Sequence, residues 1–383
     1  MILRQRLVTY GIATTAVATV ALALWLNSYS GTWASDSLTH DQPTPFETSK
    51  HRIDVVFAVD TTGSMGGLID GAKRTVWSIA SHIRELDQQA DLHVGLVAYR
   101  DLGDDYVTRD FALTSDLDSV FAELSSYQAA GGGDAPEDVD AALYDAVHKM
   151  QWREGAKKMI FLVGDAPPAS RNEVPRFEVT AREASDHQII LNTIRCGADG
   201  ETATAWQQIA SIGHGEFSTI KQDGGVQQLA TPYDDKLAKL SEAVDATAVI
   251  YGDASVHRGY QGKMEAAKAA PAAAAADRAG YYATKPMAKG EGRSREDIMG
   301  GVATGAVDVD KLTTTNLPSD MQGMSKDELK NEFGRRAKVR EQAQQEITDL
   351  AKKRAEYIRS HEKTGKDSFD DQVKATVEHE LAK

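Results

Sequence analysis

The fold is decided by the stretch IDVVFAVD, residues 53–60, and by the loop TTGSMGG, residues 61–67, that follows it. An apolar run of this length that ends in a turn is typical of a strand buried on both faces of a sheet. The next segment, residues 66–86, places apolar side chains at helical spacing, namely Leu68, Ile69, Ala72, Val76, Ile79, Ala80 and Ile83. A buried strand that turns into an amphipathic helix predicts the first unit of an α/β fold.

The same alternation continues along the chain. Further apolar runs predict strands at 92–99, 157–165 and 188–196, and a run at 106–113 that we expect to pair antiparallel at or near an edge. Helical stretches are expected at 116–128, 137–151 and 176–187, with a last helix–strand pair over 203–220 and a helix over 234–249. This order predicts a doubly wound, mostly parallel sheet with helices on both faces. Ligands bind such sheets outside the carboxyl ends of the strands, so function is sought there.

The composition excludes some functions. The chain has 383 residues and a formal net charge of −14. A chain this acidic is poorly suited to binding nucleic acid or an anionic membrane surface. Its one cysteine, Cys196, cannot form an internal disulfide, so the stability must come from packing. An exported protein of this size without disulfides points to a bacterial source.

The N-terminus predicts export. Arg4 and Arg6 precede an uncharged stretch whose apolar part runs over residues 7–26. Residues 1–34 are therefore either a signal peptide cleaved after Ala34 or a retained membrane anchor. In both cases the basic end stays inside and the rest leaves the cytoplasm, so we expect a periplasmic or extracellular protein, or one anchored to the inner membrane. Any membrane contact would be made by this segment alone.

Outside the α/β region, residues 35–50 are polar with two prolines and indicate a linker. Residues 253–320 contain Ala-, Lys- and Gly-rich stretches without a core pattern, and we interpret them as a low-complexity linker and irregular region. Residues 321–383 are expected to form a helical C-terminal extension.

Within that extension, residues 325–361 predict one long helix that starts with a capping box formed by Ser325 and Glu328. Its thin apolar stripe is interrupted by Arg336, Arg340 and Arg354. We therefore interpret it as a solvated helix that packs loosely on the main domain. A coiled-coil partner helix is the alternative.

The chemistry lies in the loop after the first strand. Asp60, Thr62 and Ser64 occupy alternate positions, which in an extended loop places their oxygen atoms on one side. Further oxygen ligands follow other strands: Asp165 ends the strand at 157–165, and Asp134 follows three glycines. Hard, oxygen-only ligands favour Mg²⁺, with Mn²⁺ or Ca²⁺ as alternatives. A plain strand-to-helix turn with a capping side chain is the simpler interpretation of the first loop, but it does not account for the other two.

These motifs resemble a von Willebrand factor A domain with a metal-ion-dependent adhesion site, over residues 51–252. Asp60, Thr62 and Ser64 match the first motif, D-x-[ST]-x-S, and Asp165 matches the third. Asp134 stands where the family usually has a threonine. The loop around it, together with YRD at 99–101, is similar to a bacterial branch.

The resemblance implies that the hydroxyls of Thr62 and Ser64 bind the metal directly. Asp60 and Asp165 would bind it directly or through water. One coordination position would be filled by a partner's carboxylate. The extra carboxylate of Asp134 should tighten metal binding and weaken the attraction for an acidic partner, so the acidity of the partner stays open.

The expected function is therefore an extracytoplasmic binding module, not an enzyme, that docks a protein or peptide through a bound metal. An anchored envelope protein with a structural or assembly role, stabilised by the metal, is one alternative. A Mg²⁺-dependent phosphohydrolase is another. An aspartate-nucleophile phosphatase needs a second acid where this chain has Thr62, which disfavours catalysis.

Overall fold

The computed structural model describes residues 51–133, 136–169, 173–226, 229–284, 293–361 and 368–383. The predicted signal or anchor at 1–34, the linker at 35–50 and the predicted ligand Asp134 lie outside the described residues. Among the described helices, none is long and apolar enough to cross a membrane.

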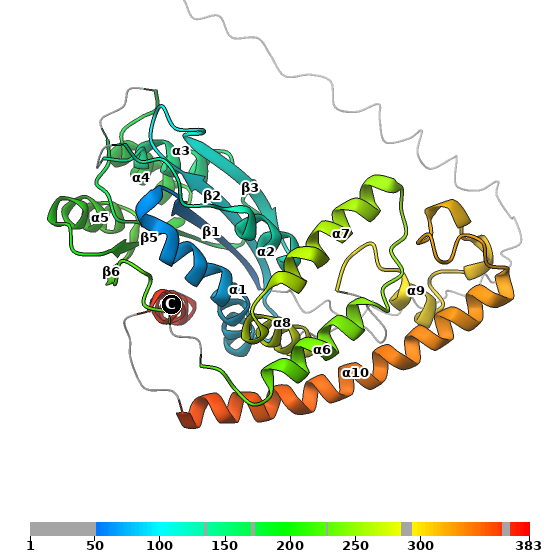
Figure 1. Ribbon diagram of the computed structural model, residues 1–383. Helices are drawn as coiled ribbons and strands as arrows, with labels where there is room; N and C mark the ends of the chain where they lie inside the picture. Colours follow the sequence, from blue (N-terminus) through cyan, green and yellow to red (C-terminus); the bar gives the residue numbers. More distant parts are fainter. Residues whose placement is uncertain (1–50, 134–135, 170–172, 227–228, 285–292, 362–367) are drawn as a thin grey trace, which may run out of the picture. The chain divides into compact units, whose positions relative to one another are not determined.

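A six-stranded sheet forms the centre of the described chain, with the order β3-β2-β1-β4-β5-β6 (Figure 1). All neighbouring strands are parallel except β2 and β3, which pair antiparallel at one edge as predicted. The strands are β1 (Arg52–Asp60), β2 (Asp91–Tyr99), β3 (Thr108–Thr114), β4 (Lys157–Gly164), β5 (Ile189–Cys196) and β6 (His214–Ile220). The doubly wound, mostly parallel fold predicted from the sequence is confirmed.

Each face of the sheet carries its own apolar core because successive side chains of a strand point to opposite sides. From β1, Val55, Phe57 and Val59 join the core under α1 and α2. Val56 and Ala58 join the core under α3, α4 and α5. The helices of these layers are α1 (Gly66–Leu86), α2 (Leu117–Ser126), α3 (Val139–His148), α4 (Phe177–Asp186) and α5 (Gly200–Ile212).

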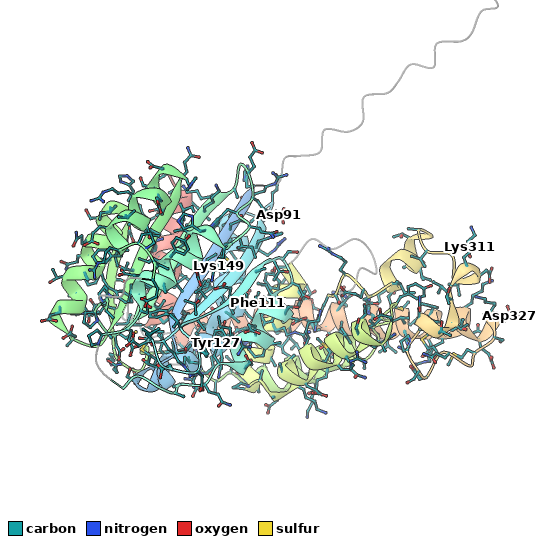
Figure 2. The ribbon with its side chains drawn as sticks, turned by 90° about the horizontal axis from the view of Figure 1, so that it is seen from above. Asp91, Phe111, Tyr127, Lys149, Lys311 and Asp327 are labelled. Atoms are coloured by element: carbon teal, nitrogen blue, oxygen red, sulfur yellow. The ribbon has the colours of Figure 1, made fainter. Side chains whose placement is uncertain are left out.

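The edge strand is tied to the second of these layers. Lys149, just after α3, places its ammonium nitrogen 2.6 Å from Asp145 Oδ2 and 3.5 Å from Asp110 Oδ2 of β3. Phe111, the residue after Asp110 on β3, pairs with Leu96 of β2. Figure 2 labels Lys149 and Phe111. The antiparallel strand is thereby held on the sheet although it has a neighbour on one side only.

The last helix, α11 (Phe369–Leu381), belongs to the core beside α1. Phe369, Val373 and Val377 are buried there, and the Phe369 ring centroid lies 6.1 Å from that of Phe57 on β1. The C-terminal part of the described chain thus returns to the core that β1 and α1 share.

Between β6 and α11 the structure differs from the predicted linker at 253–320. This region contains α7 (Ala254–Ala269), α8 (Ala272–Thr284), the short helix α9 (Met299–Thr304) and two 3-10 turns. Alanine loses little side-chain entropy in a helix, so an alanine-rich stretch can be a packed helix rather than a flexible chain. In α8, Tyr281 and Tyr282 bury their rings against Trp77 of α1, with centroids 5.7 and 5.9 Å away.

The long helix predicted after residue 325 is α10 (Lys326–His361), and its capping box is confirmed. The Ser325 backbone N–H donates to Glu328 Oε2 at 2.7 Å, and the Glu328 N–H donates to Ser325 Oγ at 3.3 Å.

The expectation of a loosely packed, solvated helix is wrong. The helix packs against α6 (Asp234–Asp245) and α8 (Figure 1). The three arginines that interrupt its apolar stripe are themselves buried. Arg354 lies 2.6 Å from both Asp234 and Asp277, and Arg340 lies 2.6 Å from Asp297. Charged side chains thus join α10 to its neighbours where apolar ones are missing.

The position of α11 in the core gives a first prediction. Phe369→Ala should lower the free energy of unfolding by about 3–5 kcal/mol, because it removes a large buried ring and leaves a cavity. Chemical denaturation of the whole chain measures this. Leu86→Ala, at a side chain that is 41% exposed, is the matched control and should change little. Equal stability of the two variants would contradict the assignment of α11 to the core.

The buried arginines give a second prediction. Arg354→Ala should destabilise the protein by about 3 kcal/mol or more, because Asp234 and Asp277 would be left without their shared cation. Arg359→Ala, on the exposed end of the same helix, should leave the denaturation midpoint unchanged. A similar midpoint for both variants would show that the buried ion pairs do not hold α10 in place.

Candidate metal centre

The candidate site lies at the carboxyl ends of three neighbouring strands. Asp60 is the last residue of β1 and pairs in register with Tyr99, the last residue of β2. On the other side of β1, β4 ends at Gly164, so Asp165 follows at the same edge. The order of the strands reverses between β1 and β4, and such a switch point opens the crevice in which doubly wound sheets bind ligands.

The carboxylate of Asp60 is held firmly on one side only. Its Oδ1 accepts hydrogen bonds from the backbone N–H of Thr62 at 2.8 Å and from the Thr62 hydroxyl at 2.7 Å. Its Oδ2 is buried and has no hydrogen-bond partner among the described residues, and the residue is 1% exposed. A buried carboxylate oxygen without a partner is costly. A bound cation would remove that cost.

Asp165 and Ser64 both lie near Gln222. The side-chain amide of Gln222 donates to Asp165 Oδ2 at 2.5 Å. Gln222 and the exposed Ser64 also line one open depression, together with Gly67, Lys221 and Asp223. Asp60 hydrogen-bonds Thr62, and Asp165 contributes to the raised pKa of Asp60, so these three sequence-predicted residues lie together. Ser64 lines the depression next to Gln222, the residue that contacts Asp165.

Glu137 is a site residue that the sequence reasoning missed. The sequence predicts a helix that starts at residue 137, but α3 begins at Val139 and its cap is Asp138, whose Oδ1 accepts from the Ala141 N–H at 3.0 Å. Glu137 itself is 3% exposed, and its Oε2 has no partner among the described residues. The only sequence signal was its place just after the glycine-rich loop and before the capping aspartate.

The glycine-rich loop brings Glu137 to the first motif. A Cβ added to Gly132 would lie 3.2 Å from Glu137 Oε1 and 3.0 Å from the Thr62 Cβ, and the φ of Gly132 is +78°. Only glycine fits this conformation and this close approach without strain. The Gly132 N–H also donates to Asp104 Oδ2 at 3.1 Å, which places the loop after β2 against the same site.

These carboxyl groups raise one another's pKa. Burial, reinforced by Asp165, raises the pKa of Asp60 to about 7 despite the hydrogen bonds from Thr62. Burial, reinforced by Asp60, Asp101 and Asp104, raises the pKa of Glu137 to about 8. Such shifts mean that the ionised carboxylates are poorly compensated by the surrounding protein groups. A divalent cation would lower both pKa values again.

The donor set suits a hard cation. The part of the chain that the structure describes holds no group of three or more His, Cys, Asp or Glu side chains with the spacing of a metal site. The hydroxyl of Thr62, which hydrogen-bonds Asp60 at 2.7 Å, and that of the exposed Ser64 add oxygen donors to the carboxylates. An all-oxygen set of hydroxyls and carboxylates fits Mg²⁺, Mn²⁺ or Ca²⁺ better than a softer metal.

Comparison with known proteins agrees with this fold. Residues 54–232 match the family described as von Willebrand factor type A domain, so the chain contains such a domain, as the sequence predicted. The chain is 28% identical over 119 residues to the alpha-protein kinase vwkA of Dictyostelium discoideum, which is 30% of this chain and 18% of that protein. It is 27% identical over 124 residues to a putative ariadne-like RING finger protein of Acanthamoeba polyphaga mimivirus, 11% of whose length is covered. The chain thus spans less than a fifth of either relative.

Solved structures with a similar fold share little sequence with this chain. The conserved hypothetical protein BatB from Bacteroides thetaiotaomicron is 19% identical, with a TM-score of 0.34, 44% of this chain covered and 90% of that one. The proximal thread matrix protein 1 from the mussel byssus, in a structure with a zinc-occupied MIDAS motif, is 15% identical, with a TM-score of 0.35, 44% of this chain covered and 41% of that one.

The raised pKa values predict how stability depends on pH without metal. The ordinary pKa is 3.8 for Asp60 and 4.5 for Glu137, and the folded chain raises both. At a pH between the ordinary and the raised pKa, the carboxyl is protonated in the folded state and ionised in the unfolded state. The stabilisation is complete below the unfolded pKa and is lost as the pH rises through about 7 for Asp60 and about 8 for Glu137. The metal-free protein should therefore become less stable between pH 5 and pH 8 by more than about 1 kcal/mol.

Thermal unfolding in a chelator, from pH 5 to pH 8, measures this loss. Asp60→Asn should flatten the profile because an amide does not ionise, while Asp235→Asn, at an exposed site on α6, should leave it unchanged. An identical slope in wild type and Asp60→Asn would refute the raised pKa. Addition of Mg²⁺ should restore the wild-type stability at pH 8.

Proposed function

We propose that the von Willebrand factor type A domain of this chain is a binding module that docks a protein or peptide through a divalent cation. The observation that supports it best is the buried Oδ2 of Asp60, which has no protein partner among the described residues at the point where three strands end. Oε2 of the nearby Glu137 is also buried and has no hydrogen-bond partner among the described residues. Two poorly compensated carboxylates at a ligand-binding edge favour a site for a cation over a purely packing role.

The proposal gives each residue a role. The hydroxyls of Thr62 and Ser64 would be neutral ligands, and Asp60 and Asp165 would bind the ion directly or through water. Asp134 stays a proposed fifth member of the set, and Glu137 is added from its burial beside Thr62. We propose Mg²⁺ as the ion, with Mn²⁺ and Ca²⁺ as alternatives. When bound, the cation would supply an electrophilic centre for an oxygen atom of the partner.

Docking rather than catalysis is the proposed activity. In this loop the second position is Thr62, whose hydroxyl donates to Asp60 and cannot act as the general acid or base that an aspartate-nucleophile phosphatase requires. We propose, from the N-terminal sequence alone, that the domain acts outside the cytoplasm. In the alternative structural or assembly role, the metal only stabilises the loops. Binding of a partner would then not depend on the metal, whereas docking would.

Titration calorimetry tests the metal site. The wild-type chain should bind Mg²⁺, and Asp60→Ala should weaken binding by at least about tenfold, because the carboxylate between β2 and β4 is lost. Asp235→Ala is the control and should bind as wild type does. Circular dichroism shows whether each variant is folded. Undiminished Mg²⁺ binding by a folded Asp60→Ala variant would remove the proposed site, and Asp60-dependent hydrolysis of a generic phosphate ester would favour the enzyme instead.

A further inference from the structure

We propose that Gln222 is a positioning residue that makes the metal site select Mg²⁺ over Ca²⁺, because its amide restricts Asp165 to binding a cation through one oxygen. This inference rests on the proposed function and specifies how the site chooses its ion. It follows from the hydrogen bonds of the two strand-end carboxylates and from the way the loop after β6 is fixed.

Mg²⁺ and Ca²⁺ differ in the carboxylate geometry that they accept. Mg²⁺ is small and requires near-octahedral coordination, with one or two carboxylates and several waters among its ligands. Ca²⁺ takes about six to eight oxygens and readily binds both oxygens of one carboxylate. Donors of the protein that already occupy one oxygen of a carboxylate therefore disfavour Ca²⁺ more than Mg²⁺.

Asp60 and Asp165 are both held in this way. Oδ1 of Asp60 accepts from the Thr62 N–H at 2.8 Å and from the Thr62 hydroxyl at 2.7 Å. Oδ2 of Asp165 accepts from Nε2 of Gln222 at 2.5 Å. The charge of Asp165 and a hydrogen bond with it both raise the pKa of Asp60, so the two carboxyl groups lie close enough to share an ion. Binding of a cation by both oxygens of either group would have to displace or crowd these donors.

The loop after β6 places the Gln222 amide. Gly197, just after β5, donates its N–H to the carbonyl of Ile220 at 3.0 Å and has a φ of +75°. A Cβ on Gly197 would collide with Oε1 of Gln222, so glycine is needed to leave room for the amide. On the other side, a Cβ on Gly67 of α1 would lie 2.9 Å from the Cα of Asp223. The loop therefore fits closely between the end of β5 and the start of α1.

The backbone, and not the side chain of Gln222, holds this loop. The Gly224 N–H donates to the carbonyl of Lys221 at 2.9 Å, and the Gly224 carbonyl accepts from the N–H of Phe369 at 2.9 Å. The side chain of Gln222 is exposed and lines the open depression beside Ser64. A substitution of Gln222 should therefore leave the fold intact, so that ion selectivity is measured separately from stability.

Titration calorimetry of the full chain with Mg²⁺ and with Ca²⁺ measures the ratio of the two affinities. The wild-type chain should bind Mg²⁺ more tightly than Ca²⁺. Gln222→Met keeps a long, uncharged side chain but has no N–H donor. It should lower the ratio of Mg²⁺ to Ca²⁺ affinity at least about tenfold, because Asp165 can then turn and offer both oxygens to Ca²⁺.

Two controls show whether Gln222 acts through Asp165. Gln208→Met, at an exposed site on α5, is the matched variant and should leave the ratio unchanged. In an Asp165→Asn background the side chain offers a metal one oxygen only, so Gln222→Met should not shift the ratio there. Thermal unfolding shows whether each variant is folded.

The outcomes separate this inference from the proposed function. An unchanged ratio in folded Gln222→Met, an equal loss of affinity for both ions, or a shift of the same size in the Asp165→Asn background overturns the inference and leaves the metal site standing. Tighter binding of Ca²⁺ than of Mg²⁺ by the wild-type chain also overturns it. Absence of binding of either ion by the wild-type chain overturns the proposed function, and the inference with it. A preference for Mg²⁺ that falls in Gln222→Met and persists in Gln208→Met supports both.

Discussion

Asp60 ends the central strand β1 between two other parallel strands, where its carboxylate is almost fully removed from water. Thr62 satisfies one of its oxygens and leaves the other without a described partner. A buried charge needs a counter-charge, and here the nearest acidic residues only increase the need. Three features bring oxygen atoms close to this position. They are the close approach of the glycine-rich loop, the turn at Thr62, and the hydrogen bond from Gln222 to Asp165.

In the remainder of the described chain, arginine side chains provide the counter-charge for buried carboxylates. Between β6 and α11 the helices bury two apolar clusters of their own, and arginines add ion pairs between the helices. Arg278 of α8 lies 2.6 Å from both Asp118 of α2 and Asp245 of α6, all of them well buried. Paired in this way the charges are tolerated, and each pair specifies one relative placement of two helices. At the end of β1, in contrast, Oδ2 of Asp60 has no cation or hydrogen-bond donor beside it among the described residues.

Sequence alone predicted what depends on local pattern. The strands β1, β2, β4 and β5 are continuous apolar runs, and the first motif lies in a loop whose glycines announce a tight turn. The sequence-based predictions were wrong where a side chain's role depends on residues distant in the chain. Arg354 looked like a break in an apolar stripe because Asp234 and Asp277 are remote in sequence. Glu137 looked like a helix start because nothing local shows that its side chain turns inward. The alanine-rich α8 looked like a linker because small side chains leave no periodic signal.

The charge at the site also bears on how a partner would arrive. Hydroxyl ligands leave the charge of a bound ion intact, so a site made only of Thr62, Ser64 and one or two acids would attract an acidic residue. Each further carboxylate shifts that balance, strengthening the hold on the ion and weakening its pull on anions. Burial, with the neighbouring carboxylates of Asp60, Asp101 and Asp104, raises the pKa of Glu137 to about 8, so the fit of a cation to this group depends on how many of these carboxylates it contacts.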